Sequence, residues 1–153
     1  MIAFQGRVFS VEVETVRHRP SVVLLPMHDG GRVMLIRQYR HSIGRETWEL
    51  PAGSLEAGES AEGAAARECE EEIALVPRHI VRLKGLFPAP GFCDEELIFF
   101  RLSDFQPRPA DSPHTQDEDE DIHARLFTIA EARAMVARGE IVDLKTAYGL
   151  TLI

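Results

Sequence analysis

The chain has 153 residues, 44% of them hydrophobic, which is enough for one packed core but too short for two independently stable domains. Its formal net charge is −8 at pH 7, so we expect neither nucleic acid nor an anionic membrane as a partner, because both repel an acidic surface. The N-terminus holds no apolar run long enough for a signal peptide or a membrane span, and Cys69 and Cys93 form no disulfide framework. These features predict a cytoplasmic protein with reduced thiols.

The N-terminal third is expected to be rich in strands. Apolar and polar residues alternate over three segments, at residues 11–14, 21–25 and 32–36. Asp29-Gly30-Gly31 supplies the positive-φ residues of a tight hairpin turn between the last two. A short strand over 48–50 ends at Pro51, and 53–59 reads as a loop. The strands within residues 5–25 are long for a small domain, and their open edges favour a homodimer.

The rest of the chain mixes helices and strands. Ser60 is a good N-cap for a helix over 61–73, which is rich in strong helix formers. Residues 103–121, with three prolines and a run of acids, predict a long exposed loop. Strands are expected at about 80–87, 95–102 and 122–127, and helices at about 128–138 and 143–152. With no internal repeat and no linker, the sequence predicts one α/β domain over residues 1–153.

The helix over 61–73 carries an unusual distribution of charge. Glu68 and Glu72 lie one turn apart on the same line of the helix, and Arg67 and Glu71 form a second i,i+4 pair. Like charges at i,i+4 repel, and glutamates 70–72 occupy the last turn, where the helix dipole favours cations. Divalent cations bound between the carboxylates would remove both penalties, and hard oxygen ligands suit Mg²⁺. The alternative is a solvated acidic face.

Six residues in and before this helix resemble the Nudix box. That motif begins with Gly, followed after five residues by Glu. After seven more residues comes the sequence Arg-Glu-apolar-any-Glu-Glu-any-Gly-apolar. The six residues are Gly53, Glu59, Arg67, Glu68, Glu71 and Glu72. Ala74 stands where the family has glycine. That glycine serves as a helix C-cap with positive φ, and alanine there costs about 1 kcal/mol unless the turn is built differently.

The resemblance implies a Nudix-type α/β/α sandwich with a mixed central sheet, a box loop and helix, and C-terminal helices. It also implies a hydrolase that cuts a diphosphate linked to a nucleoside, with Mg²⁺ or Mn²⁺ as cofactor. Glu68 and Glu72 would be the principal metal ligands, helped by Glu71 and the backbone carbonyl of Ala52. Arg67 would orient the glutamates. Gly53 would let the loop pass close to the helix, and Glu59 would join loop to helix.

Two further segments are similar to ADP-ribose pyrophosphatases and imply a nucleoside diphosphate sugar as substrate. They are Arg37-Gln-Tyr-Arg40 with Trp48-Glu-Leu-Pro-Ala-Gly53, and Pro88-Ala-Pro-Gly-Phe-Cys-Asp-Glu95, in which Pro90 falls at the position of a marker proline. The substrate-binding residues expected from them are Arg37, Arg40, Trp48, Glu49 and Pro90, with Arg40 contacting phosphate and Glu49 the nucleoside or ribose. Each has a structural alternative: solvated arginines, a core tryptophan and an ordinary proline-glycine turn.

The acidic run Asp117–Asp121 is either a solvated loop or part of the catalytic apparatus. In the resembling enzymes, the loop before this strand supplies a glutamate that acts as general base. Matching the Glu-Asp-Ile ending indicates Glu118, with Glu120 as alternative base or extra metal ligand. Relatives also commonly dimerise through the N-terminal strands. Two rival functions stay open: the same chemistry on another sugar nucleotide such as GDP-mannose, and a non-catalytic sensor of sugar nucleotides.

Overall fold

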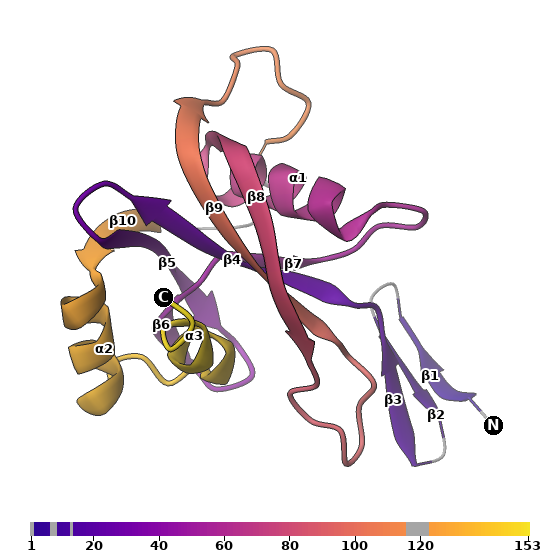
Figure 1. The fold of residues 1–153 in the computed structure, drawn as a ribbon. Coiled ribbons are helices and arrows are strands. Elements are labelled where there is room, and N and C mark those ends of the chain that lie inside the picture. The colour runs from indigo at the N-terminus through magenta and orange to yellow at the C-terminus, as the bar shows by residue number, and fades with distance from the viewer. Residues whose placement is uncertain (1, 7–8, 13, 116–122) are drawn as a thin grey trace.

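The computed structural model describes residues 2–6, 9–12, 14–115 and 123–153 (Figure 1). The helices are α1 (Ala61–Ile73), α2 (Ile129–Ala137) and α3 (Leu144–Gly149). The strands are β1 (Ile2–Gln5), β2 (Phe9–Glu12), β3 (Thr15–His18), β4 (Ser21–His28), β5 (Arg32–Arg40), β6 (Arg45–Glu49), β7 (Ala52–Ser54), β8 (Leu75–Leu86), β9 (Leu97–Pro107) and β10 (His123–Thr128). None of the described helices is long and apolar enough to cross a membrane.

The strands form two sheets. The larger has the order β10-β5-β4-β9-β8, with β6 added on β5 and β7 on β4. Its β4–β9 pair is parallel and its other pairs are antiparallel, so the mixed sheet expected from the sequence is confirmed. The smaller sheet, β1-β2-β3, lies at the N-terminal end, apart from the helices in Figure 1.

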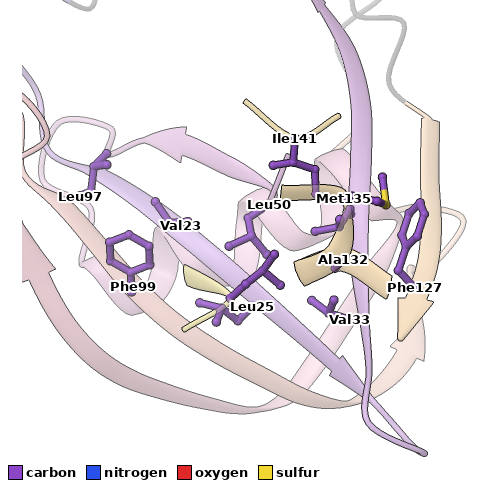
Figure 2. Close-up of a cluster of buried hydrophobic side chains, with 12 residues drawn as sticks. Val23, Leu25, Val33, Leu50, Leu97, Phe99, Phe127, Ala132, Met135 and Ile141 are labelled. Atoms are coloured by element: carbon purple, nitrogen blue, oxygen red, sulfur yellow. The ribbon is translucent and has the colours of Figure 1, made fainter. Parts of the chain in front are cut away.

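The central strand β4 contributes to a core on both faces of the larger sheet. Side chains alternate across a strand, so Val22 and Leu24 pack with Ala65 and Cys69 of α1. Val23 and Leu25 pack on the opposite side in the cluster of Figure 2, which includes residues of α2 and the stretch leading to α3. Helices therefore cover both faces, and the α/β/α sandwich is confirmed.

The boundaries of several elements differ from the prediction. Strand β8 begins at Leu75, and β9 continues to Pro107, so residues 103–107 are strand rather than loop. The cause is cross-strand pairing of Leu75 with Pro107 and Pro77 with Phe105. In addition, Phe105 packs on the core and stacks against His28, with ring centroids 4.6 Å apart. These tertiary contacts outweigh the loop-forming composition.

Smaller corrections concern the other elements. The predicted strand at 48–50 spans Arg45–Glu49, the start of the predicted loop forms the short strand β7, and the last helix covers only Leu144–Gly149. The hairpin turn is confirmed, with φ of 74° at Gly30 and 67° at Gly31.

Both predicted ends of α1 are observed. The Ser60 hydroxyl accepts a 3.0 Å hydrogen bond from the backbone N–H of Gly63. Ala74 adopts the left-handed conformation at φ 56° and ψ 34°, the geometry that the family's glycine would take without strain. Cys69 is fully buried on the inner face, and burial raises the pKa of its thiol to about 12. It serves packing.

Candidate active site

Arg67 is the centre of an ion-pair network that joins α1 to the loop before it. Its guanidinium donates to Glu59 at 2.9 and 3.0 Å, to Glu68 at 2.7 Å, to Glu71 at 2.8 Å and to the Ser54 carbonyl at 3.1 Å. Its side chain is only 12% exposed. The hydrogen bond with Glu59, reinforced by the charges of Glu68 and Glu71, raises the pKa of Arg67, and the same bond lowers the pKa of Glu59. The predicted i,i+4 pair and the loop-to-helix link are both present.

Glu68 and Glu72 lie against the backbone of β7. A Glu72 carboxylate oxygen accepts a 2.8 Å hydrogen bond from the Ala52 N–H. Gly53 is the point of closest approach, because a Cβ atom there would lie within 3.0 Å of all three carboxyl atoms of Glu68. Only glycine leaves this space to the carboxylate, as expected from the sequence.

The donor set of this region suits a hard divalent cation. The carboxylates of Glu68 and Glu72 both lie against the backbone at Ala52 and Gly53, and Mg²⁺ prefers oxygen ligands. Within the described ranges, no three histidine, cysteine, aspartate or glutamate side chains are grouped to hold an ion. The nearby Glu71 is held by Arg67, and its other oxygen lies 3.8 Å from Nδ1 of His114. The oxygen donors present therefore fit Mg²⁺ in their chemistry.

A cavity of about 350 Å³ adjoins this region and is lined by Ala52, Gly53 and Ser54. Further lining comes from elements distant in sequence: His18 and Ser21 near the start of β4, Pro88, Glu95 and Leu97 around the start of β9, and Arg40, Asp143, Leu144 and Lys145. The Ser21 hydroxyl donates to Glu95 at 2.8 Å, and Nδ1 of His18 lies 3.5 Å from the same carboxylate. Cationic, hydroxyl and carboxylate groups thus share the cavity with the box loop.

A buried carboxylate organises the cationic part of this cavity. Glu49 is 2% exposed and accepts two hydrogen bonds from Arg40, at 2.8 and 2.6 Å, and one from Nζ of Lys145. Lys145 also donates to Asp143 at 3.0 Å. Burial alone would raise the pKa of Glu49, but the hydrogen bonds and charges of Arg40 and Lys145 hold that pKa below its ordinary value. Glu49 is therefore ionised at neutral pH.

The start of α3 is tied to the same place. Asp143 caps the helix by accepting from the Thr146 N–H at 2.9 Å and from its hydroxyl. The Thr146 hydroxyl oxygen in turn accepts a 2.7 Å hydrogen bond from the N–H of Leu50, the residue after Glu49. These bonds fix Lys145 relative to β6.

Other predicted substrate-binding residues lie elsewhere. Trp48 is half-buried and packs edge-on against Phe127, with ring centroids 4.9 Å apart, while Arg37 lies 6.0 Å from the centroid of the Trp48 ring. Pro90 is exposed in the loop between β8 and β9. None of Trp48, Arg37 and Pro90 lines the 350 Å³ cavity. Glu118 and Glu120 lie outside the described residues.

Sequence reasoning missed Lys145, Asp143 and Thr146, as well as the His18, Ser21 and Glu95 group. One feature of the sequence could have indicated Lys145. A lysine in the first turn of a helix opposes the helix dipole, so its placement calls for a nearby anion, and Glu49 is that anion.

Segment 108–115 is anchored on the end of α1. Arg108 donates to the Glu70 carbonyl at 3.1 Å and to the His114 carbonyl at 3.0 Å, and its own N–H donates to the Ala74 carbonyl at 3.0 Å. The Ser112 hydroxyl donates to the Glu70 carboxylate at 2.7 Å. The chain is thereby fixed beside the glutamates of α1 just before residues 116–122.

The sandwich, with glutamates on the helix beside its box loop, is the arrangement of a class of hydrolases. Residues 17–145 match the family model described as NUDIX domain, and the chain belongs to the Nudix family. It is thus a Nudix pyrophosphohydrolase, as the resemblance implied.

Two curated relatives cover most of the chain. The ADP-ribose pyrophosphatase of Mycobacterium tuberculosis (strain ATCC 25618 / H37Rv) is 40% identical over 141 residues, covering 92% of this chain and 67% of that protein. The ADP-ribose pyrophosphatase of Bacillus subtilis (strain 168) is 32% identical over 137 residues, covering 90% and 73%. A solved structure titled as an ADP compounds hydrolase superimposes with a TM-score of 0.81 over 99% of this chain and 88% of that one. At 22% identity, that likeness supports the fold alone.

Proposed function

We propose that the protein hydrolyses the diphosphate of a nucleoside diphosphate sugar with Mg²⁺ or Mn²⁺, and that ADP-ribose, cleaved to AMP and ribose 5-phosphate, is its preferred substrate. The observation that carries this proposal is the approach of Glu68 and Glu72 to Ala52 and Gly53, at the wall of a cavity that also holds Arg40. The names of the two curated relatives support the choice of substrate.

The chain's own residues divide the work. Glu68 and Glu72, assisted by Glu71 and the Ala52 carbonyl, would hold the metal. When bound, a hard divalent ion neutralises phosphate charge and lowers the pKa of the attacking water. Arg67 touches Glu59, Glu68 and Glu71 at once, so it fixes their carboxylates in advance and lowers the reorganisation needed during reaction.

Glu118 is proposed as the general base, with Glu120 as alternative base or additional ligand. The support comes from the described chain on one side of them: Arg108 and Ser112 anchor the preceding segment on α1, and His114 lies beside Glu71. Glu118→Gln should lower turnover by roughly 100-fold or more with little change in substrate affinity. Unchanged turnover in this variant, together with loss of turnover in Glu120→Gln, would transfer the role to Glu120.

Arg40 is proposed to contact phosphate, because it lines the cavity and its side chain is 41% exposed despite the pairing with Glu49. Guanidinium groups match phosphate oxygens well. Substrate contacts of Arg37, Trp48 and Pro90 stay predictions.

We further propose that residues 1–153 act as one Nudix domain and form a homodimer through the N-terminal strands within residues 5–25. In the smaller sheet, Ile2, Phe4 and Phe9 are 58%, 51% and 42% exposed, and exposed apolar side chains on open strands favour pairing with a second copy. Light scattering after size-exclusion chromatography measures the mass. A cytoplasmic location stays a prediction.

The test of function is direct. The purified protein is incubated with ADP-ribose and Mg²⁺, and AMP is measured; GDP-mannose and other sugar nucleotides form the comparison panel, and water labelled with ¹⁸O shows which phosphorus is attacked. We expect hydrolysis that EDTA abolishes and that ADP-ribose supports best. Binding of ADP-ribose without any hydrolysis would instead favour the sensor, and a higher kcat/KM for GDP-mannose would change the substrate.

A further inference from the structure

The Arg40–Glu49–Lys145 triad forms a wall shared by two cavities. Arg40 and Lys145 line the 350 Å³ cavity beside the box loop and a second cavity of about 360 Å³ beside the β5–β6 turn. Glu49 lines only the second. The cavity beside the box loop therefore meets the two cations of the triad without its carboxylate.

We propose that Lys145 is a substrate-binding residue that acts with Arg40 on the phosphate oxygens, and that Glu49 is the positioning residue that holds both cations in place. This inference rests on the proposed function and gives the diphosphate a second set of contacts besides the metal.

The placement of Glu49 favours positioning over direct contact with the nucleoside or ribose. Its carboxylate is 2% exposed, and both oxygens accept bonds from Arg40 and Lys145. In the cavity beside the box loop, a carboxylate so enclosed and already bonded to two cations is not placed to contact a ligand. Its negative charge keeps two cations side by side that would otherwise repel each other.

The two cations keep hydrogen-bond donors for a ligand. Arg40 pairs with Glu49 through Nε and one terminal nitrogen, and among the described residues its Nη1 has no acceptor. Lys145 has three N–H groups, of which Glu49 and Asp143 take two. Asp143 is itself occupied by the Thr146 N–H and hydroxyl. The remaining donors suit an anion.

Arg40 and Lys145 lie beside the box loop, where the proposed function places the diphosphate. The cavity lined by Arg40 and Lys145 is also lined by Ala52 and Gly53, against which Glu72 and Glu68 lie. A diphosphate in this cavity can thus meet metal-binding carboxylates and fixed cations together. Because Lys145 is only 13% exposed, its contact with phosphate is shielded from water, which strengthens it.

The test compares Lys145→Met and Lys145→Arg with Lys84→Met, which removes the chain's other lysine at an exposed position of β8. We expect Lys145→Met to raise KM for ADP-ribose about 10-fold with kcat within about 3-fold of wild type, since a charge-assisted hydrogen bond is lost. Lys145→Arg should recover most of the affinity, and Lys84→Met should behave as wild type.

A binding measurement separates this inference from the proposed function. Titration calorimetry with ADP in EDTA, with adenosine as the uncharged ligand, measures phosphate contact without metal or turnover. We expect ADP to bind Lys145→Met about 10-fold more weakly than Lys84→Met, while adenosine binds both equally. Absence of hydrolysis by the wild type would defeat the proposed function yet leave this difference measurable.

A double variant distinguishes ligand contact from simple neutralisation of Glu49. If Lys145 only balances the buried charge, Lys145→Met would cost no ADP affinity in the Glu49→Gln background, and the inference would be overturned. Equal ADP affinity in Lys145→Met and Lys84→Met would overturn it as well. ADP binding that is weaker in the double variant than in Glu49→Gln alone, with unfolding temperatures close to that of Lys84→Met, supports direct contact.

Discussion

Gly53→Ala should separate catalysis from stability. A methyl group at this position would lie well inside 3.0 Å of the Glu68 carboxyl atoms, whereas ordinary contacts begin at 3.4 Å. The backbone at 53 has no positive φ, so alanine is compatible with the chain there. The Glu68 carboxylate is the end of a flexible side chain and must move by about 1 Å or more. Displacements of that size in a catalytic group can cost about 100-fold in rate.

The cost in folding should be small by comparison. Moving Glu68 weakens one of the ion pairs of Arg67, but the pairs with Glu59 and Glu71 stay in place. Replacing glycine with alanine also reduces the entropy of the unfolded chain, which offsets part of that loss. We therefore expect kcat/KM to fall about 100-fold or more and the free energy of unfolding to stay within about 1 kcal/mol of wild type.

The assay measures AMP release over a range of Mg²⁺ concentrations together with urea unfolding. Gly139→Ala is the matched control, because Gly139 has φ 74° and open space around its Cα. That variant should lose about 1 kcal/mol of stability and keep its activity, the reverse pattern. Full activity of Gly53→Ala at wild-type Mg²⁺ concentrations would refute the role given to Glu68.

Three further predictions concern α1 and its network. Ala74→Gly should stabilise the protein by about 1 kcal/mol in urea unfolding without changing activity, because Ala74 holds a left-handed conformation; an unchanged unfolding midpoint would contradict this. The lowered pKa of Glu59 means that its pairing with Arg67 stabilises the fold fully above the ordinary value of 4.5 and is lost as pH falls through the lowered native value. Unfolding free energy should thus drop on acidification below about pH 5, and less steeply in Glu59→Gln; parallel pH curves would argue against the pairing. Cys69, buried and with a thiol pKa near 12, should resist thiol reagents at pH 8 until the protein unfolds, whereas half-buried Cys93 should react in the native state; labelling of Cys69 in the folded protein would show that α1 opens.

The parts of the site that were predictable are local in sequence. Ser60, Arg67 and Glu71 act through helix periodicity and capping, whose spacing is set by 3.6 residues per turn, and each lies where that geometry requires. Gly53 was predictable because its spacing to the helix follows the family pattern. Ala74 shows that the backbone geometry of this turn is retained even with the less suitable residue.

The remainder depends on contacts between distant segments. Glu49 and Lys145 are 96 residues apart, and no periodicity links a strand residue to a lysine near the C-terminus. The extension of β9 to Pro107 likewise depends on pairing with β8, which overrides the proline-rich composition of 103–113. Local propensity describes a segment by itself, whereas these features exist only once the sheet has formed.

Two helices carry charges at the end where the helix dipole disfavours them, and both of these ends lie near the candidate active site. In α1 the last turn holds glutamates and no basic residue, and Arg108 from a distant segment donates to the Glu70 carbonyl. In α3 the first turn holds Lys145, and the buried Glu49 compensates it. Both placements oppose the helix dipole, and both adjoin the cavity or the carboxylates that the proposed reaction uses. Ion pairs within the fold compensate both arrangements, and the proposed site, with cations beside one wall and phosphate beside another, would make use of both.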